Sequence, residues 1–119
     1  MPPLREVLLV ALGGGLGSTL RFLAASAMTR LFPAFPLGTL LVNVVGCFAM
    51  GLLAGLTSDR SLRAALGVGL LGGFTTFSAF GGDTLALAQG GAMKLAAVNV
   101  LANVGLGLLA VWAGRALVS

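Results

Sequence analysis

Residues 72–80 read Gly-Gly-Phe-Thr-Thr-Phe-Ser-Ala-Phe, and this stretch lies in the middle of an otherwise continuous apolar segment. Paired glycines weaken a helix, and the hydroxyl and aromatic side chains that follow them are unusual in a lipid-facing span. Backbone that leaves the helix inside a bilayer survives only where protein or a polar cavity satisfies its N–H and C=O groups. The stretch therefore predicts a pathway or an ion site within a membrane.

The composition is that of a membrane protein. Of the 119 residues, 58% are hydrophobic and 8% are charged, and the sequence contains no His and no Tyr. The mean hydropathy is +1.08. Four apolar stretches reach the roughly 20 residues that a helix needs to cross a bilayer. They are residues 7–28, 37–56, 64–88 and 95–114.

These stretches predict an all-α membrane protein with four transmembrane helices, the third of them broken. The connections are short and hold most of the charge, so we expect residues 1–119 to form a single transmembrane channel domain. Residues 1–6 are too few to be the front of a signal peptide, and no persuasive cleavage site follows them. We therefore expect the first apolar stretch to be a helix of the mature protein.

The positive charges are divided almost evenly between the two membrane faces. One face would collect Arg5, Arg60, Arg63 and Arg115, and the other Arg30 and Lys94, with Arg21 reaching out from within the first helix. Such a division gives only a weak signal for one orientation in the membrane. Our hypothesis is therefore that two copies insert in opposite directions and pair antiparallel. The formal net charge of +4 is scattered over helix ends and forms no patch, which argues against a nucleic-acid partner.

Few side chains are available for catalysis. The chain has no His, a single Cys (Cys47) and three carboxylates, which are Glu6, Asp59 and Asp83. Hydrolytic and redox enzymes need general bases, metal ligands or paired thiols, so an enzyme is not expected. Only Asp83 lies well inside a predicted span, where an acid is a candidate functional group. A capping or structural role is the alternative for Asp83.

Neutral hydrogen-bond donors dominate the polar residues of the spans. They are Ser18, Thr19, Thr39, Asn43, Thr75, Thr76, Ser78, Asn99 and Asn103. Amide and hydroxyl groups can replace part of the hydration shell of a small anion, so this set favours an anion over a cation. Thr39 and Asn43 are four residues apart and share one face of the second helix. The alternative for Asn43 is an interhelical hydrogen bond that holds the bundle together.

Two aromatic residues follow the break at helical spacing. Phe77 and Phe80 are three apart, so their rings share a face wherever the helix resumes. The edges of aromatic rings are electropositive, and a pair of edges beside a narrow route can pass an anion without binding it tightly. The alternative is ordinary packing against lipid or core, the class in which we place Phe48 and Phe74.

The break itself is a candidate cation site. The last carbonyls of an interrupted helix lack amide partners and carry partial negative charge, so Gly72, Gly73 and Thr75 mark a place where a cation can bind. The alternative is a glycine kink sealed by the Thr75 or Thr76 hydroxyl bonding back to the backbone.

A second copy of the chain is expected for transport, because four helices of ~30 Å enclose little of a polar route by themselves. Small residues spaced four apart let helices approach closely, and this spacing occurs at Gly13/Gly17, Gly51/Gly55 and Gly69/Gly73. Packing within one bundle is the alternative for each pair.

Several motifs together resemble the Fluc (CrcB) family of fluoride channels, and the resemblance spans nearly the whole chain. The most specific motif is the stretch 72–80 quoted above. The others are a Gly-Gly-x-x-Gly that begins at Gly13 and is followed by Arg21, the run 36–40 (Pro-Leu-Gly-Thr-Leu) leading to Asn43 and Gly46, and the pair Asn99 and Asn103.

The resemblance implies a fluoride exporter of the bacterial plasma membrane, embedded in lipid as an antiparallel homodimer with two pores and a structural Na⁺ at the dimer centre. It also implies that the backbone carbonyls of Gly72 and Thr75 hold the Na⁺, and that Arg21 lies near a pore vestibule. The residues that the resemblance and the donor set place along the fluoride route are Asn43, Phe77, Phe80, Ser78, Thr76, Thr39 and Arg21.

The chain departs from the family's pattern at three positions. Ala79 replaces a common Thr, Asp83 stands where a Glu is usual, and Gly107 occupies a position that often carries a hydroxyl. The last departure leaves open whether a hydroxyl-lined track follows the fourth helix.

Two other function classes remain as alternatives. A small multidrug-resistance-type exporter shares the length, the helix count and the antiparallel dimer, but it couples protons to cationic drugs through an acid deep in its first helix. Here that helix has only Glu6, at its edge. A structural bundle without transport would need neither a broken third helix nor a lining of donors.

Overall fold

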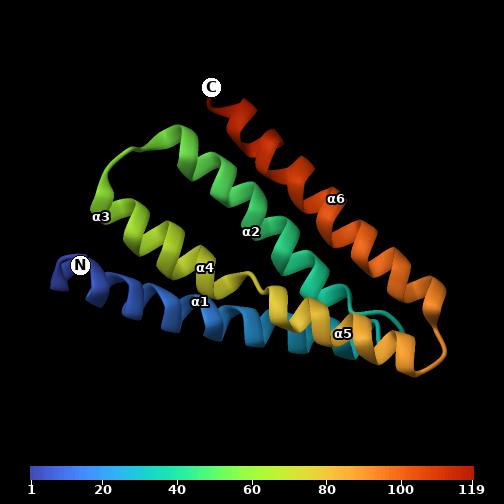
Figure 1. The fold of residues 1–119 in the computed structure, drawn as a ribbon. Helices are drawn as coiled ribbons and strands as arrows, with labels where there is room; N and C mark the ends of the chain where they lie inside the picture. Colours follow the sequence, from blue (N-terminus) through green and yellow to red (C-terminus); the bar gives the residue numbers. More distant parts are fainter.

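The structure, a computed structural model, describes all residues from Met1 to Ser119 as helices joined by short loops. Three helices are continuous, namely α1 (Leu4–Leu31), α2 (Leu37–Leu56) and α6 (Met93–Leu117) (Figure 1). Between α2 and α6 the chain forms α3 (Arg60–Leu62), the π-helix η1 (Arg63–Leu71), α4 (Gly72–Phe74) and α5 (Phe77–Gln89).

Four helical stretches are long and apolar enough to cross a membrane. They are Leu4–Leu31, Leu37–Leu56, Arg60–Gln89 and Met93–Leu117. The prediction of an all-helical chain with four spans is therefore confirmed. Successive spans run in opposite directions, so the start of α1, the end of α2, the start of α3 and the end of α6 lie at the same end of the molecule (Figure 1).

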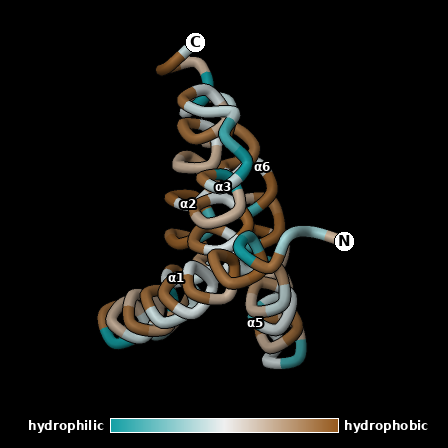
Figure 2. Tube along the Cα trace, turned by 90° about the vertical axis from the view of Figure 1, so that its left-hand side faces the viewer, coloured by the Kyte–Doolittle hydropathy of each residue, from teal (hydrophilic) through white to brown (hydrophobic).

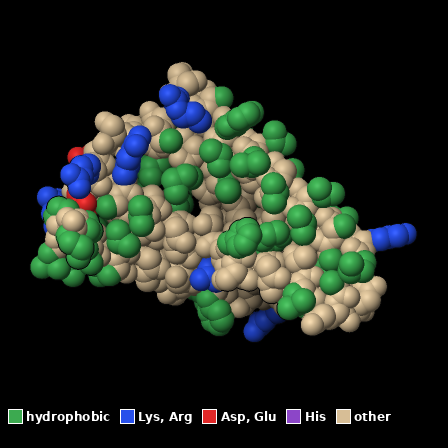
Figure 3. Space-filling model, viewed as in Figure 1, with side chains coloured by type: hydrophobic (Ala, Val, Ile, Leu, Met, Phe, Trp, Pro, Cys, Tyr) green, Lys and Arg blue, Asp and Glu red, His purple; other side chains and the backbone are tan.

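The outside of the bundle is apolar. Only 15 of the 119 residues are buried, and large side chains such as Leu12, Phe22, Leu101 and Trp112 are exposed. Hydrophobic residues occur all along the helices in Figure 2, and Figure 3 shows apolar side chains spread over one face with most Lys and Arg at its periphery. An apolar exterior of this extent suits a lipid environment, because lipid tails solvate it and water does not.

Glycine allows the helix backbones to meet within the chain. A Cβ added to Gly51 of α2 would collide with the Val111 carbonyl of α6, and a Cβ added to Gly114 would collide with the Phe48 carbonyl. In the same way Gly17 of α1 lies against the Leu70 carbonyl of η1. The packing of α2 on α6 and of α1 on η1 and α4 therefore depends on bare backbone at the crossing points.

The glycine pairs singled out in the sequence are used inside one chain. Gly13 meets the Ala65 carbonyl, Gly69 meets Val10, and Gly73 meets Gly14 across the interface of α1 with η1 and α4. Gly55 lies under the side chains of Val118 and Arg115. Packing within the bundle is thus the role that the structure gives to these pairs.

The third span changes its helical geometry before it breaks. Along Arg63–Leu71 the backbone is π-helical, and the N–H of Gly72 still donates to the carbonyl of Gly67, five residues earlier. The helix then tightens for one short turn and stops. Thr75 (φ −86°, ψ 160°) and Thr76 (φ −152°, ψ 125°) are both extended, and α5 begins at the next residue. The interruption therefore falls inside the stretch 72–80.

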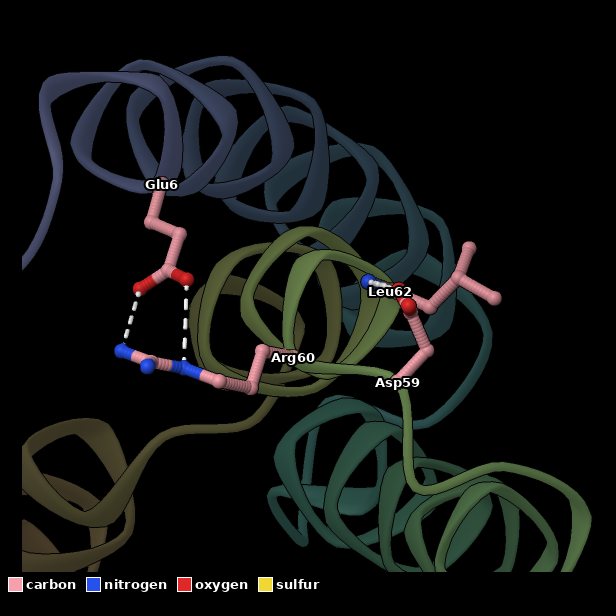
Figure 4. A network of polar contacts seen from close by, with 4 residues as sticks. All are labelled: Glu6, Asp59, Arg60 and Leu62. Atoms are coloured by element: carbon pink, nitrogen blue, oxygen red, sulfur yellow. Dashed lines mark hydrogen bonds and ion pairs between the residues drawn. The ribbon is translucent and has the colours of Figure 1, made fainter.

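Polar contacts fix the loop between α2 and α3. The Asp59 carboxylate accepts a hydrogen bond of 2.9 Å from the N–H of Leu62 and so caps α3 (Figure 4). Arg60 forms an ion pair with Glu6 of α1, with Nε 3.4 Å from Oε1 (Figure 4). The Arg60 side chain is 78% exposed, so this pair adds little to stability. Arg63 donates to the carbonyls of Thr57 (2.9 Å) and Ala54 (3.2 Å), which otherwise end α2 without partners.

Candidate functional site

The Asn43 side chain takes the place of a helical partner for the extended backbone of Thr76. The N–H of Thr76 donates to Asn43 Oδ1 at 2.8 Å, and Asn43 Nδ2 donates to the carbonyl of Thr76 at 3.0 Å. One amide group thereby satisfies both the N–H and the C=O of Thr76. Because unpaired peptide groups are costly at membrane depth, Asn43 makes the interruption possible.

Asn43 also links the break to the last helix. Its Nδ2 donates a second hydrogen bond, of 2.9 Å, to Oδ1 of Asn103 on α6. A primary amide has two N–H groups, and here both are in use. The interhelical bond considered as the alternative for Asn43 is therefore present. An anion that approaches this side chain must share or replace one of its two hydrogen bonds.

The hydrogen bonds continue from Asn103 back to α5. Asn103 Nδ2 donates to the carbonyl (2.9 Å) and to Oδ1 (3.0 Å) of Asn99, one turn earlier. Asn99 Nδ2 donates to Oγ1 of Thr84 at 3.0 Å, and the Thr84 hydroxyl donates to the carbonyl of Phe80 at 2.8 Å. No buried side-chain nitrogen or oxygen lacks a partner. We call this chain of contacts from Thr76 through Asn43, Asn103, Asn99 and Thr84 to Phe80 the amide network.

A cavity of about 290 Å³ opens beside the break, and no charged residue lines it. Its lining consists of Asn43, Cys47, Thr75, Thr76, Phe77, Phe80, Asn103, Val104, Gly107 and Leu108. The structure thus brings together Asn43, Thr76 and the two phenylalanines that the sequence placed on the fluoride route. Cys47 and Gly107 face each other here, because a Cβ on Gly107 would lie 3.5 Å from the Cys47 sulfur.

Phe77 and Phe80 pack edge to face, with ring centroids 5.3 Å apart and ring planes at 71°. Phe80 is buried, with 8% of its surface exposed, whereas Phe77 is 81% exposed. The pair therefore spans from the interior of the chain to its surface, and the cavity beside it is open on the side of Phe77. Electropositive ring edges in such a lining favour a negatively charged occupant.

A second cavity, of about 410 Å³, lies on the other side of Thr76. Arg21, Phe22, Ala25, Ser26, Thr29, Thr39, Thr76, Ala79 and Asp83 line it. Thr39 and Arg21 thus lie apart from the aromatic pair, and Thr76 is the residue that the two cavities share. Arg21 and Asp83 supply opposite charges to this lining, whereas the first cavity has none.

The hydroxyl groups at the break have local roles. Thr76 Oγ1 accepts a hydrogen bond of 3.0 Å from the N–H of Ala79 and so caps α5. Ser78 is exposed, with its Oγ 3.3 Å from Thr76 Oγ1, and it lines neither cavity. The N–H and the Oγ1 of Thr75 both donate to the Leu71 carbonyl, each at 3.0 Å, as in the sealed kink considered above.

The break also leaves main-chain oxygens for a cation. The Thr75 carbonyl has no hydrogen-bond partner within the chain, and the N–H groups of Thr75 and Thr76 bond to Leu71 and Asn43 rather than to the Gly72 carbonyl. Gly72 is exposed at the surface of the chain. No group of three or more His, Cys, Asp or Glu could hold a metal ion. A donor set of carbonyl oxygens suits a hard cation such as Na⁺ and not a transition metal.

The sequence pointed to Asn43, Phe77 and Phe80 and counted Asn99 and Asn103 among the donors of the spans, but it gave these two no partner and did not include Thr84. Asn99 is the only large side chain that is completely buried. The spacing of four between Asn99 and Asn103 is a readable signal, because such residues share one face of a helix. Nothing in the sequence indicates that Thr84 meets this face.

Comparison with known proteins agrees with the resemblance in sequence. Residues 8–115 match the family described as CrcB-like protein, Camphor Resistance (CrcB). A protein of Solibacter usitatus named "Fluoride-specific ion channel FluC" is 48% identical over 118 residues, which cover 94% of this chain and 97% of that protein. Proteins of the same name from Rhizobium etli and Shewanella sp. (strain ANA-3) are 47% and 46% identical, and each match covers at least 94% of both chains. The chain therefore belongs to the CrcB family.

Proposed function

We propose that this chain is a passive, fluoride-selective ion channel that exports fluoride across the bacterial plasma membrane. The observation that carries the proposal is the near-complete match to relatives named fluoride-specific ion channels. A channel of this kind is not an enzyme and needs no catalytic residue. The multidrug-type exporter finds no support, because the acid of α1, Glu6, lies at the helix start and is paired with Arg60.

The two cavities suggest how fluoride would move. The Arg21 guanidinium attracts anions into the second cavity, and Thr76 leads from there to the first cavity, which holds Phe77 and Phe80 and which we call the aromatic cavity. In the aromatic cavity the ion meets the edges of Phe77 and Phe80 and the amide of Asn43. No cation lines this cavity, so fluoride is stabilised by neutral groups and is not trapped, which conduction requires.

The functional unit is an antiparallel homodimer with dual topology. A single chain leaves Phe77 81% exposed, so the aromatic cavity has an open side that a second copy would close. The nearly even division of Lys and Arg between the two ends favours insertion in both directions. In such a dimer each copy contributes to the wall of two equivalent pores.

A structural Na⁺ at the centre of the dimer would be held by the carbonyls of Gly72 and Thr75 from each copy. The support is the chemistry of these groups: the Thr75 carbonyl has no partner in the chain, and Gly72 lies at the surface. A bound Na⁺ supplies fixed positive charge in a region of low dielectric, which offsets part of the cost of bringing fluoride into the bundle.

Flux from liposomes tests the proposal. Purified protein is reconstituted with internal potassium fluoride, and a fluoride electrode follows efflux. Because passive movement of an anion builds up charge, rapid efflux is expected only after a potassium ionophore is added. Liposomes loaded with potassium chloride, read with a chloride electrode, should release little. Fluoride efflux strictly coupled to protons, or efflux of cationic dyes instead, would contradict a passive fluoride channel.

A further inference from the structure

The helix that carries the aromatic pair is fixed by hydrogen bonds at both ends of its first two turns. At its start, Thr76 is bound through its backbone to Asn43. Two turns later, Thr84 receives a hydrogen bond of 3.0 Å from Asn99 of α6 and donates one of 2.8 Å to the carbonyl of Phe80. The amide network therefore closes a loop that begins at Thr76, the residue that caps α5, and ends at Phe80 within α5.

Thr84 differs from the other threonines that bond back along a helix. Thr19, Thr29 and Thr75 also donate to the carbonyl four residues earlier, at 2.7, 2.9 and 3.0 Å, but none of these hydroxyls bonds to another helix. The Thr84 hydroxyl alone accepts a hydrogen bond from a completely buried side chain, Asn99, while it donates to its own helix. The Thr84 hydroxyl therefore links α6 to the backbone of Phe80 through two consecutive hydrogen bonds.

One face of α5 packs against no other part of the chain at this level. Gly81 and Gly82 follow Phe80, and a Cβ added to either would meet no atom within 4 Å. The chain therefore holds α5 from the side that meets α6, and there the Asn99–Thr84 hydrogen bond opposes rotation or sliding of α5. Hydrogen bonds between helices take this role in membranes, where burial of apolar surface does not drive helices together.

We propose that Asn99 and Thr84 are positioning residues that set the angle of the Phe80 ring against Phe77. This inference rests on the proposed fluoride channel and specifies which polar pair controls its aromatic lining. The edge-to-face arrangement at 71° depends on the backbone of Phe80, and the Thr84 hydroxyl bonds to that backbone directly. When the Asn99–Thr84 pair is lost, both rings are still present, but they are no longer held at the angle that passes fluoride.

A single and a double substitution separate positioning from mere stabilisation. Thr84→Val keeps the shape of the side chain but leaves Asn99 Nδ2 without its acceptor, which lowers stability. Thr84→Val with Asn99→Leu removes both partners, and replacing both partners of a buried hydrogen bond by apolar groups of similar shape is nearly neutral for stability. In the double variant Asn103 Nδ2 keeps its bond to the Asn99 carbonyl, which is backbone, but loses its bond to Asn99 Oδ1.

The experiment measures fluoride efflux, thermal stability and elution volume of the full-length protein. We expect the double variant to regain part of the melting temperature that Thr84→Val loses, while its flux stays roughly five- to thirtyfold low, the effect of losing one to two kcal/mol of positional restraint. Thr84→Ser, which keeps the hydroxyl, should retain flux. Thr19→Val is the matched control, because it removes the same kind of bond to the helix backbone without an interhelical partner.

The outcomes distinguish this inference from the function on which it rests. A double variant with both stability and flux restored, beside a wild type that conducts, would overturn the positioning role and leave the channel standing. Loss of flux in Thr19→Val as large as in Thr84→Val would also overturn it. A wild type that releases no fluoride would instead overturn the proposed function, and the positioning role with it.

Discussion

Arg21 of α1 donates a hydrogen bond of 3.0 Å from its Nε to the carbonyl of Gly73, at the point where the third span is interrupted. The end of an interrupted helix carries partial negative charge on its carbonyls, so a guanidinium there is electrostatically favoured. The same side chain lines the second cavity. Arg21 thus contributes to the stability of the break and to the charge that an entering anion meets.

Replacement of Arg21 should separate these two contributions. Arg21→Gln removes the charge but keeps N–H donors, so we expect stability to fall by about 1–2 kcal/mol because a charged hydrogen bond is stronger than a neutral one. Flux should fall more at low ionic strength than at high, because screening already reduces the attraction of the wild-type charge. Denaturant unfolding in detergent and flux at two salt concentrations measure both effects. Equal loss of flux at both salt concentrations would leave Arg21 with the structural role alone.

Asn43→Asp should impair both folding and flux. The aspartate can still accept from the N–H of Thr76, but it cannot donate to the Thr76 carbonyl or to Asn103. We expect a loss of roughly 2–4 kcal/mol, since two acceptors lose their donor at membrane depth. Unfolding measurements and fluoride efflux test this. Asp59→Asn, at the exposed cap of α3, is a control for changing an Asn/Asp side chain elsewhere. Wild-type stability of Asn43→Asp would show that the Asn43 donors are dispensable.

Replacement of either Phe77 or Phe80 should lower fluoride flux, although only Phe80 is buried. Phe77→Ile should cost little stability because Phe77 is 81% exposed, whereas Phe80→Ile should cost roughly 1–3 kcal/mol because Phe80 is buried. Both substitutions remove an electropositive ring edge, so we expect both to suppress fluoride efflux while the elution volume is unchanged. Phe74→Ile is the control, since Phe74 lies outside the aromatic cavity. Normal flux in both variants would favour the packing role.

Chemical modification of the single cysteine tests whether the aromatic cavity lies on the fluoride route. Cys47 lines it opposite Gly107 and is the only thiol in the chain. A small methanethiosulfonate reagent that reaches this thiol adds bulk to a space of about 290 Å³, so we expect fluoride efflux to stop. Reduction should restore efflux, and Cys47→Ala should be insensitive. Complete labelling of Cys47, verified by mass spectrometry, with efflux unchanged would place the fluoride route elsewhere.

Removal of Na⁺ tests the main-chain oxygens at the break. If the Gly72 and Thr75 carbonyls of two copies hold the ion, prolonged exchange into choline should weaken the dimer, and addition of Na⁺ should restore it. Thr75→Ser should behave as wild type because the ligand is a backbone oxygen. Gly72→Val should weaken the dimer even in Na⁺, since a β-branched residue distorts the interrupted helix. Dimers that are equally stable in choline and in Na⁺ would contradict the site.

The four spans and the interruption could be predicted because they are local features of the sequence. Apolar length defines the spans, and Gly72, Gly73 and the hydroxyl residues after them define the break. Two local features were still hidden. The π-helical geometry of Arg63–Leu71 has no evident pattern in its residues, and the shared face of Thr39 and Asn43 did not show that the two side chains line different cavities.

The contacts that build the site could not be predicted, because they join residues far apart in the chain. Asn43 meets Thr76 across 33 positions and Asn103 across 60. Which amide reaches which backbone depends on the rotation and height of α2 and α6, and glycine contacts such as Gly51 on Val111 set these. Periodicity gives the face of a helix but not the residue it meets on its neighbour.

The amide network also has a consequence for the order in which the chain is assembled. During synthesis, α2 precedes the interrupted span, so Asn43 is available as soon as Thr76 enters the membrane. Asn99 and Asn103 belong to α6, the last helix to leave the ribosome, so the Thr84 hydroxyl lacks its interhelical partner until then. A nascent chain that ends before Met93 can therefore form the hydrogen bonds between Asn43 and Thr76 at the break. It lacks the bond from Asn99 to Thr84 that fixes α5. The arrival of the fourth span adds the wall that α6 gives to the aromatic cavity.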